Sequence, residues 1–337
     1  MKKLRIGIIG VGKIAESAHL PSLLKSETAE LVLLIDSSAE RVTQFKETYG
    51  LDTPHCSSLD EMPDTIDAVI VCTPNHTHKD ICITCLDRGV HVLVEKPLTN
   101  TVEDAVGIER KAKETGCVVM AGYCTRYWKS VQYVKSLLDR QMLGAVKKFV
   151  FQYGAAGGWA PYSNYILSRQ QAGGGAFVIN GSHYLDRMLW YFGVPERHVF
   201  YDDEMGGLEA NALAEFHYQG EGSSFKGIIR VSKTVSLDAG CYIECEKGTI
   251  IHNDWKSPTV SLKLNDAVMG ETLAVQAPGL DFAEREDMYL MQLDEFVRRI
   301  VNQSDDGIAS LEDAVNNVRI AAALYENKQP MECHWYK

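Results

Sequence analysis

The first group of residues suited to chemistry is a glycine-rich turn close to the start of the chain. It reads Gly10-Val11-Gly12-Lys13-Ile14-Ala15, a G-x-G-x-x-A pattern between an apolar run over residues 4–9 and a helical pattern that ends near residue 26. Gly10 permits a tight turn, and Gly12 lets the backbone approach a pyrophosphate. The free N–H groups and the dipole at the helix start favour phosphate oxygens. This spacing predicts a dinucleotide-binding turn.

An acidic residue completes the nucleotide-binding pattern. The second predicted strand, residues 30–35, ends at Asp36, where a carboxylate can accept hydrogen bonds from both ribose hydroxyls. Ser37 and Ser38 follow, and Arg41 lies one turn into the next predicted helix. Because no arginine directly adjoins Asp36 to neutralise a 2′-phosphate, we predict that the chain binds NAD in preference to NADP.

Two further groups follow the next apolar strands of the pattern. Thr73-Pro74-Asn75-His76-Thr77-His78 comes after residues 68–72, and Glu95-Lys96-Pro97 comes after residues 91–94. Open α/β sheets bind their ligands at the carboxyl ends of the strands, so we expect both groups at the ligand. A lysine there can assist proton transfer if its surroundings lower its pKa. His76 and His78 make two metal ligands without a third, and we predict no metal site.

The last group follows a glycine run. Gly173-Gly174-Gly175-Ala176 opens a helical pattern that carries His183 and Asp186. Histidine serves as a general base near neutral pH, and Asp186, three residues further along, could orient the ring by bonding its second nitrogen. The alternative is that His183 is a buried histidine with a structural hydrogen bond only.

The elements that must position these groups begin with a part in which strands and helices alternate. We predict strands over residues 4–9, 30–35, 68–72, 91–94 and 118–121. Ser38 and Gly50 bound one intervening helix, and Thr101 and Gly116 are the N-cap and the stop of another. This alternation predicts an α/β fold, with a doubly wound parallel Rossmann sheet over residues 1–122 that binds NAD.

The pattern changes in residues 123–337. Helical patterns lie near residues 129–141, 286–302 and 311–327, and segments of period two lie at residues 147–153, 210–218, 225–232, 241–246 and 260–264. These segments predict a C-terminal α+β domain whose large, mostly antiparallel sheet has one open face. We expect Phe149, Phe151, Ile229 and Val231 on that outer face, where they would form an apolar patch that a partner covers.

Composition narrows the class of protein. The 337 residues carry a net charge of -11 and are 45% hydrophobic and 23% charged. This length predicts two domains, and the negative charge disfavours nucleic-acid binding. No apolar run approaches the roughly 18 residues of a membrane span, and we expect no signal peptide because the first residues already read as a strand. The nine cysteines then indicate reduced thiols, and we expect a cytoplasmic protein without membrane contact.

With these residues the chain resembles the glucose–fructose oxidoreductase, inositol dehydrogenase and rhizopine catabolism (Gfo/Idh/MocA) family. The resemblance rests on the turn at Gly10, on Glu95-Lys96-Pro97 and on the glycine run before His183. It implies an NAD-dependent dehydrogenase or reductase that acts on CH–OH groups of small carbohydrates or polyols. It also implies a homodimer or homotetramer built on the C-terminal sheet.

The resemblance implies roles for individual residues. Lys96 would hydrogen-bond the reacting hydroxyl and assist proton transfer together with His183, so these two are the predicted catalytic residues. The predicted cofactor-binding residues are Gly10, Gly12, Lys13, Ile14, Asp36, Thr73, Pro74, Asn75, His78, Glu95 and Lys96. The predicted substrate-binding residues are Lys96, Arg126, Tyr165, Asn180 and His183.

The chain departs from the family pattern beside His183. Members commonly have an aspartate four residues before this histidine, and that position is Ile179 here. Residues four apart share one face of an α-helix, so we expect Ile179 next to the ring of His183, with Asn180 on the other flank as a neutral hydrogen-bonding group. The aromatic-arginine pair common before the glycine run is replaced by Tyr165-Ile166. Both changes indicate either an altered substrate or lost turnover.

Three functions therefore stay open. The first is hydride transfer between NAD and a secondary alcohol or ketone of a sugar, inositol-like polyol, amino sugar or nucleotide sugar. The second is a glycosidase that uses tightly held NAD transiently. The third is a dinucleotide-binding regulatory protein without turnover, which the loss of the aspartate favours and the presence of Lys96 and His183 disfavours.

Overall fold

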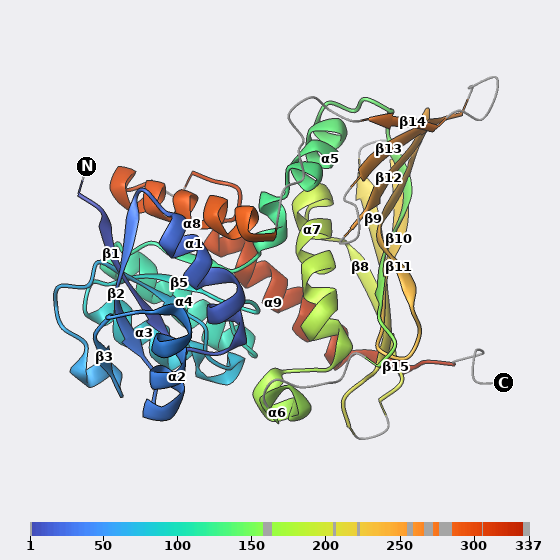
Figure 1. Ribbon diagram of the computed structural model, residues 1–337. Helices are drawn as coiled ribbons and strands as arrows, with labels where there is room; N and C mark the ends of the chain where they lie inside the picture. The colour runs from blue at the N-terminus through green and yellow to red at the C-terminus, as the bar shows by residue number, and fades with distance from the viewer. Residues whose placement is uncertain are drawn as a thin grey trace. The chain divides into compact units, whose positions relative to one another are not determined.

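The computed structural model describes residues 2–157, 164–204, 207–220, 223–254, 259–265, 272–275, 285–304 and 306–332. The chain forms two compact units, the first of Met1–Tyr127 with Ala283–Val318 and the second of Trp128–Phe282 with Arg319–Lys337 (Figure 1). This division differs from the boundary that we predicted at residues 122 and 123. The difference arises because a late helix, α8 (Arg285–Asn302), buries its apolar side chains in the core of the first unit.

The first unit contains a parallel sheet of six strands in the order β3-β2-β1-β4-β5-β6. The strands are β1 (Leu4–Ile9), β2 (Ala29–Ile35), β3 (His55–Cys56), β4 (Ala68–Val71), β5 (His91–Val94) and β6 (Val119–Ala121). The strand order reverses direction between β1 and β4, and such a switch point is where doubly wound sheets bind ligands. The predicted Rossmann sheet is confirmed, although the two-residue strand β3 was too short to locate from the sequence.

Helices cover both faces of this sheet. They are α1 (Leu20–Lys25), α2 (Ala39–Tyr49), α3 (His78–Asp87), α4 (Val102–Thr115), α8 (Arg285–Asn302) and α9 (Leu311–Glu326). One face packs against α1, α2 and α8, and the other against α3, α4 and the first part of α9. Ile8 faces the first of these layers and Ile9 the second. Because both faces are buried, the strands read as continuous apolar runs.

The predicted helix limits are confirmed by their caps. The hydroxyl of Ser38 accepts a hydrogen bond from the backbone N–H of Arg41, and α2 ends at Gly50 in a left-handed conformation. Thr101 caps α4 through the backbone N–H of Asp104. These contacts span three residues or fewer, so local sequence determines them.

The second unit contains a sheet of nine strands in the order β14-β13-β12-β11-β7-β10-β9-β8-β15. The strands are β7 (Val146–Gly154), β8 (Arg197–Asp202), β9 (Asn211–Gly220), β10 (Ser223–Ser232), β11 (Leu237–Cys245), β12 (Gly248–Asn253), β13 (Thr259–Leu264), β14 (Thr272–Val275) and β15 (Lys328–Pro330). The β7–β10 and β8–β15 pairs are parallel and the others are antiparallel. The predicted mostly antiparallel sheet is confirmed, and β8, β12, β14 and β15 are additions to the prediction.

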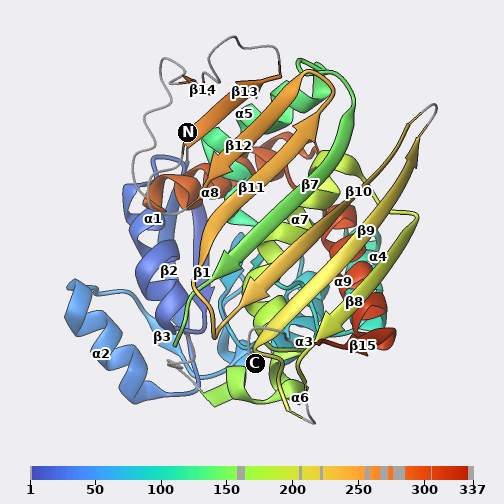
Figure 2. The same cartoon turned by 90° about the vertical axis from the view of Figure 1, so that its right-hand side faces the viewer.

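One face of this sheet packs on the helices of the second unit, and Figure 2 shows the strands from the other face. The packed helices are α5 (Lys129–Asp139), α7 (Ser182–Phe192) and the end of α9, while the short helix α6 is Arg169–Ala172. Phe149, Phe151, Ile229 and Val231 lie in this core at 0–1% exposure. Our prediction that they occupy the outer face was therefore wrong. The outer face also carries apolar residues, such as Val150 and Ile228, so alternation alone could not decide which set faces the helices.

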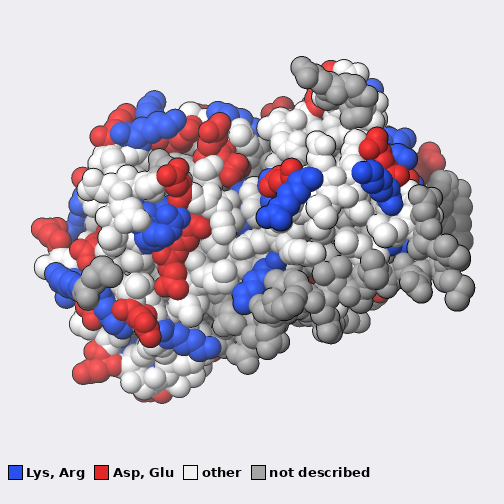
Figure 3. All heavy atoms as spheres, turned by 90° about the horizontal axis from the view of Figure 1, so that it is seen from above, with Lys and Arg blue, Asp and Glu red and all other residues white. Residues whose placement is uncertain are grey.

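The described surface carries both signs of charge. On the face shown in Figure 3, Lys and Arg side chains lie among Asp and Glu side chains rather than in one basic area. Among the described residues, none of the helices has the length and hydropathy that crossing a membrane requires.

Candidate active site

The glycine turn after β1 combines a tightly packed position, Gly10, with an open one, Gly12. Gly10 has φ of +89°, and a Cβ there would lie 2.9 Å from Thr73 Cγ2. A side chain at Gly10 would therefore strain the backbone and collide with the segment after β4. At Gly12, by contrast, a Cβ would meet no protein atom within 4 Å. Gly10 is needed for the protein's own packing, and Gly12 leaves space beside the helix start that fits a pyrophosphate.

The helix after this turn begins with an unexpected segment. Ala15–His19 is π-helical, and α1 continues from Leu20. Lys13 is exposed and forms an ion pair with Glu16 at 3.0 Å, and Ile14 is half-buried. A π-helical turn shifts the following side chains by one position relative to α-helical spacing. His19, the last residue of the segment, is buried.

Asp36 is held at the end of β2 by three groups of the protein. Its carboxylate accepts hydrogen bonds from Val11 N at 3.0 Å and Ser38 N at 2.9 Å. Arg41 Nη2 lies 3.4 Å from Asp36 Oδ1. The bond to Val11 joins the predicted ribose-binding acid directly to the glycine turn, so two parts of the nucleotide-binding pattern form one structure.

The segments after β4 and β5 lie at the same edge of the sheet. Hydrogen bonds from Gly10 N to Ile35 O at 2.8 Å and from Glu95 N to Val71 O at 2.9 Å continue the sheet to its carboxyl end. Thr73, Pro74 and Lys96 are half-buried there, and Asn75 is buried. The structure thus brings the predicted cofactor-binding residues of the first unit to one edge.

Glu95 is a buried carboxylate that forms a close pair with His19. Its Oε1 lies 2.7 Å from His19 Nε2, and its Oε2 accepts a hydrogen bond from Lys96 N at 3.2 Å. Burial acts to raise the pKa of Glu95, but the hydrogen bond and charge of His19, together with the charge of Lys96, lower it overall. The ionised carboxylate therefore fixes the backbone at Lys96. We missed His19 in the sequence, where its only signal was its place on the helix that follows the glycine turn.

His78 has a different position from the predicted cofactor contact. It is fully buried, with Nε2 2.9 Å from Thr73 O and Nδ1 3.1 Å from Pro97 O. Burial lowers the pKa of His78, against the effect of these backbone contacts. The ring joins the segment after β4 to the segment after β5, so it positions both rather than lining the cofactor site.

Arg126 also has a structural environment. Its side chain is fully buried, and its Nη1 donates to Ile308 O and to Asp313 Oδ2, both at 2.8 Å. Burial acts to raise the pKa of Asp313, but the charge and the hydrogen bond of Arg126 lower it overall. The guanidinium holds the loop before α9 within the first unit, which does not support the predicted contact with substrate.

In the second unit, three predicted residues lie on the accessible part of one helical stretch. Between Gly174 and Leu189, all of which is described, only Ile179, Asn180 and His183 are partly exposed. The segment Phe177–Gly181 is π-helical. The α-helical rule that residues four apart share one face therefore does not show whether Ile179 and His183 lie on the same face of this helix. Asp186 is fully buried, and its bond to His183 stays a prediction. Tyr165 is half-buried in the separate 3₁₀ helix Asn164–Leu167.

A buried ionic network holds the part of α7 that directly follows His183. Arg187 donates to both carboxylate oxygens of Asp254 at 3.0 Å, and Tyr184 Oη donates to Oδ2 at 2.7 Å. His252 Nδ1 lies 3.1 Å from Asp254 Oδ1. Burial and the charge of Arg187 lower the pKa of His252 to about 4, although Asp254 opposes this shift. The network ties α7 to the end of β12, and sequence spacing contained no signal for it.

Comparison with known proteins agrees with this arrangement. The profile of the oxidoreductase family with an NAD-binding Rossmann fold matches residues 4–123, and that of the GFO/IDH/MocA C-terminal domain matches residues 131–251. The chain belongs to the Gfo/Idh/MocA family. The predicted resemblance is thereby confirmed, as is the assignment of an NAD-binding Rossmann domain.

Several proteins with named activities are similar to this chain. A 4-carboxy-2-hydroxymuconate-6-semialdehyde dehydrogenase of Sphingobium is 35% identical over 39% of this chain, and the match covers 42% of that relative. A myo-inositol 2-dehydrogenase of Thermotoga maritima is 25% identical over 88% of both chains. The solved structure of levoglucosan dehydrogenase with NADH and levoglucosan has a TM-score of 0.84 at 17% identity and covers 97% of both chains. This last likeness shows that the two proteins share a fold.

Proposed function

We propose that the protein is an NAD-dependent oxidoreductase acting on a secondary alcohol or ketone of a sugar, inositol-like polyol, amino sugar or nucleotide sugar. The observation that carries this proposal is the placement of Lys96 after β5. This is the same sheet edge that carries the open space at Gly12 and the carboxylate of Asp36. Two relatives named as dehydrogenases support the reaction type. NAD, when bound, supplies the acceptor of the hydride.

In this proposal the chain's own residues bind the substrate and move one proton. Lys96 donates a hydrogen bond to the reacting hydroxyl, and His183 accepts the hydroxyl proton near neutral pH. Asn180 and Tyr165 bind further polar groups of the substrate. Glu95 positions Lys96 through the backbone N–H and does not itself exchange the proton, because its pairing with His19 keeps it ionised.

Ile179 bears on which substrate the protein accepts. An isoleucine cannot accept a hydrogen bond from a sugar hydroxyl, and it is partly exposed near His183 in the sequence. We propose that it contacts an apolar part of the substrate, so Ile179→Asp should lower activity on the native substrate because the new carboxylate is desolvated there. A gain of activity on simple polyols would show instead that the position is a degenerate form of the usual site.

One experiment separates the three open functions. Purified protein is titrated with NADH by fluorescence and then supplied with NAD and a panel of polyols, sugars and glycosides, with both NADH absorbance and product formation followed. Net NADH formation supports the oxidoreductase. Glycoside cleavage without net NADH formation would indicate transient use of NAD, and binding without any conversion would indicate a regulatory protein.

Cofactor preference gives a second test. We propose that NADH binds at least about tenfold more tightly than NADPH, a difference of about 1.4 kcal/mol, because the Asp36 carboxylate is adjacent to the ribose site. Arg41 lies 3.4 Å from Asp36 and partly offsets this repulsion. Equal dissociation constants in fluorescence titrations would contradict the assignment.

We also propose that the open face of the sheet in the second unit pairs with a second copy of the chain. Support comes from an apolar row across neighbouring strands, in which Val150 is paired with Ile228 and with Tyr242, the last 39% exposed. Tyr242→Lys should shift a dimer or tetramer toward monomer in sedimentation velocity. A monomeric wild-type protein at micromolar concentration would refute the interface.

The proposed location is the cytoplasm. Support comes from the cysteines of the described residues, which are in the thiol form and, apart from Cys117, buried. Thiols that are not oxidised to disulfides are typical of a reducing compartment.

A further inference from the structure

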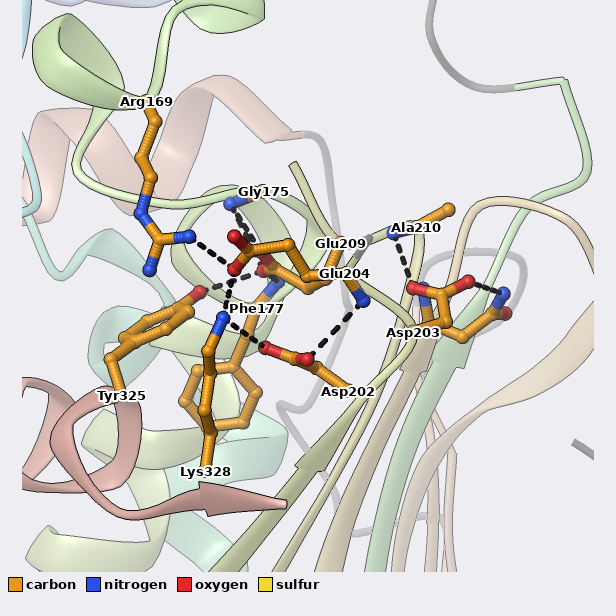
Figure 4. Close-up of polar contacts among 11 residues, drawn as sticks. Arg169, Gly175, Phe177, Asp202, Asp203, Glu204, Glu209, Ala210, Tyr325 and Lys328 are labelled. Atoms are coloured by element: carbon orange, nitrogen blue, oxygen red, sulfur yellow. Dashed lines mark hydrogen bonds and ion pairs between the residues drawn. The ribbon is translucent and has the colours of Figure 1, made fainter. Parts of the chain in front are cut away.

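Three consecutive backbone N–H groups at the start of the helix that carries His183 bond to one residue, Glu209. Gly175 N donates to both carboxylate oxygens at 2.8 and 2.9 Å, and Phe177 N donates to Oε1 at 3.0 Å (Figure 4). Between them, Ala176 N donates to the backbone O of Glu209 at 2.9 Å. The first N–H groups of a helix have no partner within the helix, so Glu209 decides where this helix begins.

The glycine run makes this contact possible. A Cβ at Gly175 would lie 2.7 Å from Glu209 Oε2 and would also collide with Glu209 O. A Cβ at Gly174 would collide with the hydroxyl of Tyr325, on α9. Glycines at these positions therefore let a buried carboxylate and a phenol reach the backbone itself.

The donors to the Glu209 carboxylate are uncharged. Besides the two N–H groups, Tyr325 Oη donates to Oε1 at 2.7 Å. The neighbouring cations Arg169 and Lys328 pair with a different acid, Glu204 (Figure 4). Glu209 is 1% exposed, and burying a carboxylate costs free energy that a small capping side chain would not. Capping alone does not explain a buried glutamate here.

We propose that Glu209, with Tyr325, is a positioning residue that sets the orientation of His183. Gly175 O accepts the hydrogen bond of Ile179 N at 3.0 Å, so the backbone that Glu209 holds leads directly into the π-helical segment Phe177–Gly181. His183 follows two residues after that segment, and the Arg187–Asp254 pair holds the same helix one turn further on. The inference rests on the proposed role of His183 as the proton acceptor.

The test compares Glu209→Gln with a matched control, Glu204→Gln, in the full-length protein. Glu204 belongs to the same polar cluster and has a largely buried side chain, but it bonds to the side chains of Arg169 and Lys328 rather than to the helix start. Gln at position 209 keeps the size and replaces one acceptor oxygen by a donor that faces backbone N–H groups. We expect the melting temperature to fall in both variants.

The decisive readouts are those that a stability role would not change. In ¹H–¹⁵N spectra of histidine side chains, assigned with His183→Asn, we expect the His183 signals and their titration midpoint to shift in Glu209→Gln and to stay unchanged in Glu204→Gln. On a substrate found by the polyol screen, we expect kcat to fall about 10- to 100-fold in Glu209→Gln with an unchanged KM for NAD. In Glu204→Gln both constants should stay near wild type.

The outcomes separate this proposal from the proposed function. Unchanged His183 signals in Glu209→Gln would overturn the positioning role, whatever the turnover. Shifted signals in a protein that converts no substrate would support the positioning role and contradict the function. If Glu209→Gln does not fold, Tyr325→Phe, which removes one hydrogen bond, must shift the His183 signals in the same direction by a smaller amount, and unchanged signals there would refute the proposal.

Discussion

Each unit of the molecule contains a buried glutamate that holds a segment with a proposed catalytic residue, and the two glutamates differ in their partners. Glu95, in the first unit, pairs with the imidazole of His19 at 2.7 Å. Glu209, in the second, accepts hydrogen bonds from backbone N–H groups and from Tyr325. Burial acts to raise the pKa of both carboxyls. His19 and Lys96 lower that of Glu95 overall, whereas neutral donors leave that of Glu209 raised.

The comparison shows that a buried carboxylate can anchor backbone with either kind of partner, but that the partner decides its protonation. A charged partner stabilises the ionised form, and neutral donors only partly compensate for lost hydration. Both glutamates also contact π-helical segments, Ala15–His19 through its last residue and Phe177–Gly181 through its first. Such segments are frequent at functional sites.

The largest expected effects concern the residues that the two glutamates serve. If Glu95 and Glu209 hold catalytic segments, Lys96→Met should abolish turnover, and His183→Ala should lower kcat by about 10²–10⁴-fold, the range for a group that transfers a proton. NADH affinity, measured by fluorescence titration, should change little. Lys113→Met is the control, because Lys113 is 74% exposed and forms a surface ion pair with Glu109. Wild-type turnover in either active-site variant would contradict the claim that each glutamate holds a segment with a catalytic residue.

Substitution by alanine should have different effects at Gly175 and at Gly12: the first should lower stability, and the second should weaken NADH binding. Gly175→Ala places a methyl group against Glu209 and should lower the free energy of unfolding by about 1–3 kcal/mol, the usual cost of overpacking. Gly12→Ala meets no protein atom within 4 Å, so the urea midpoint should stay near wild type while the dissociation constant of NADH rises at least about tenfold. Equal destabilisation of both variants would show that Gly12 serves protein packing rather than ligand binding.

The pH dependence of stability should have opposite signs for the two glutamates. The raised pKa of Glu209 means that its contribution is fully present below 4.5 and is lost as the pH rises through its folded-state pKa. The lowered pKa of Glu95 means that its contribution is present above 4.5 and is lost as the pH falls through its folded-state pKa. Carboxyl ¹³C titrations, assigned with Glu95→Gln and Glu209→Gln, should give midpoints on opposite sides of 4.5. Two midpoints on the same side would remove the proposed contrast.

The smallest effect is expected for a pair whose cation is largely exposed to solvent. Arg41 is 58% exposed where it approaches Asp36 at 3.4 Å. Arg41→Ala should therefore change the free energy of unfolding by less than about 0.5 kcal/mol in urea denaturation. His19→Ala, which removes the buried partner of Glu95, serves as the reference and should cost several times more. A similar loss in both variants would show that pairing, rather than burial, determines the strength of these contacts.

Much of the fold could be predicted because its signals lie within a few residues of one another. The turn at Gly10, the caps at Ser38 and Thr101 and the apolar strands each depend on neighbouring residues, whose spacing is visible in the chain. The placement of Lys96 at the ligand edge follows from its position after a strand. The same logic located His183 on a helix, but not its π-helical approach.

Local residue patterns therefore specify the dinucleotide-binding sheet, its helix limits and the residue types available for proton transfer. The distant side chains that hold these segments in place follow only from the folded structure. Glu95 meets His19 across 76 residues, Glu209 meets Gly175 across 34, and Asp313 meets Arg126 across 187. The folded structure also decided that Phe149 faces the helices rather than the open side of its sheet. Local periodicity specifies backbone conformation, whereas a partner distant in the chain is selected only when packing brings complementary charges and shapes together.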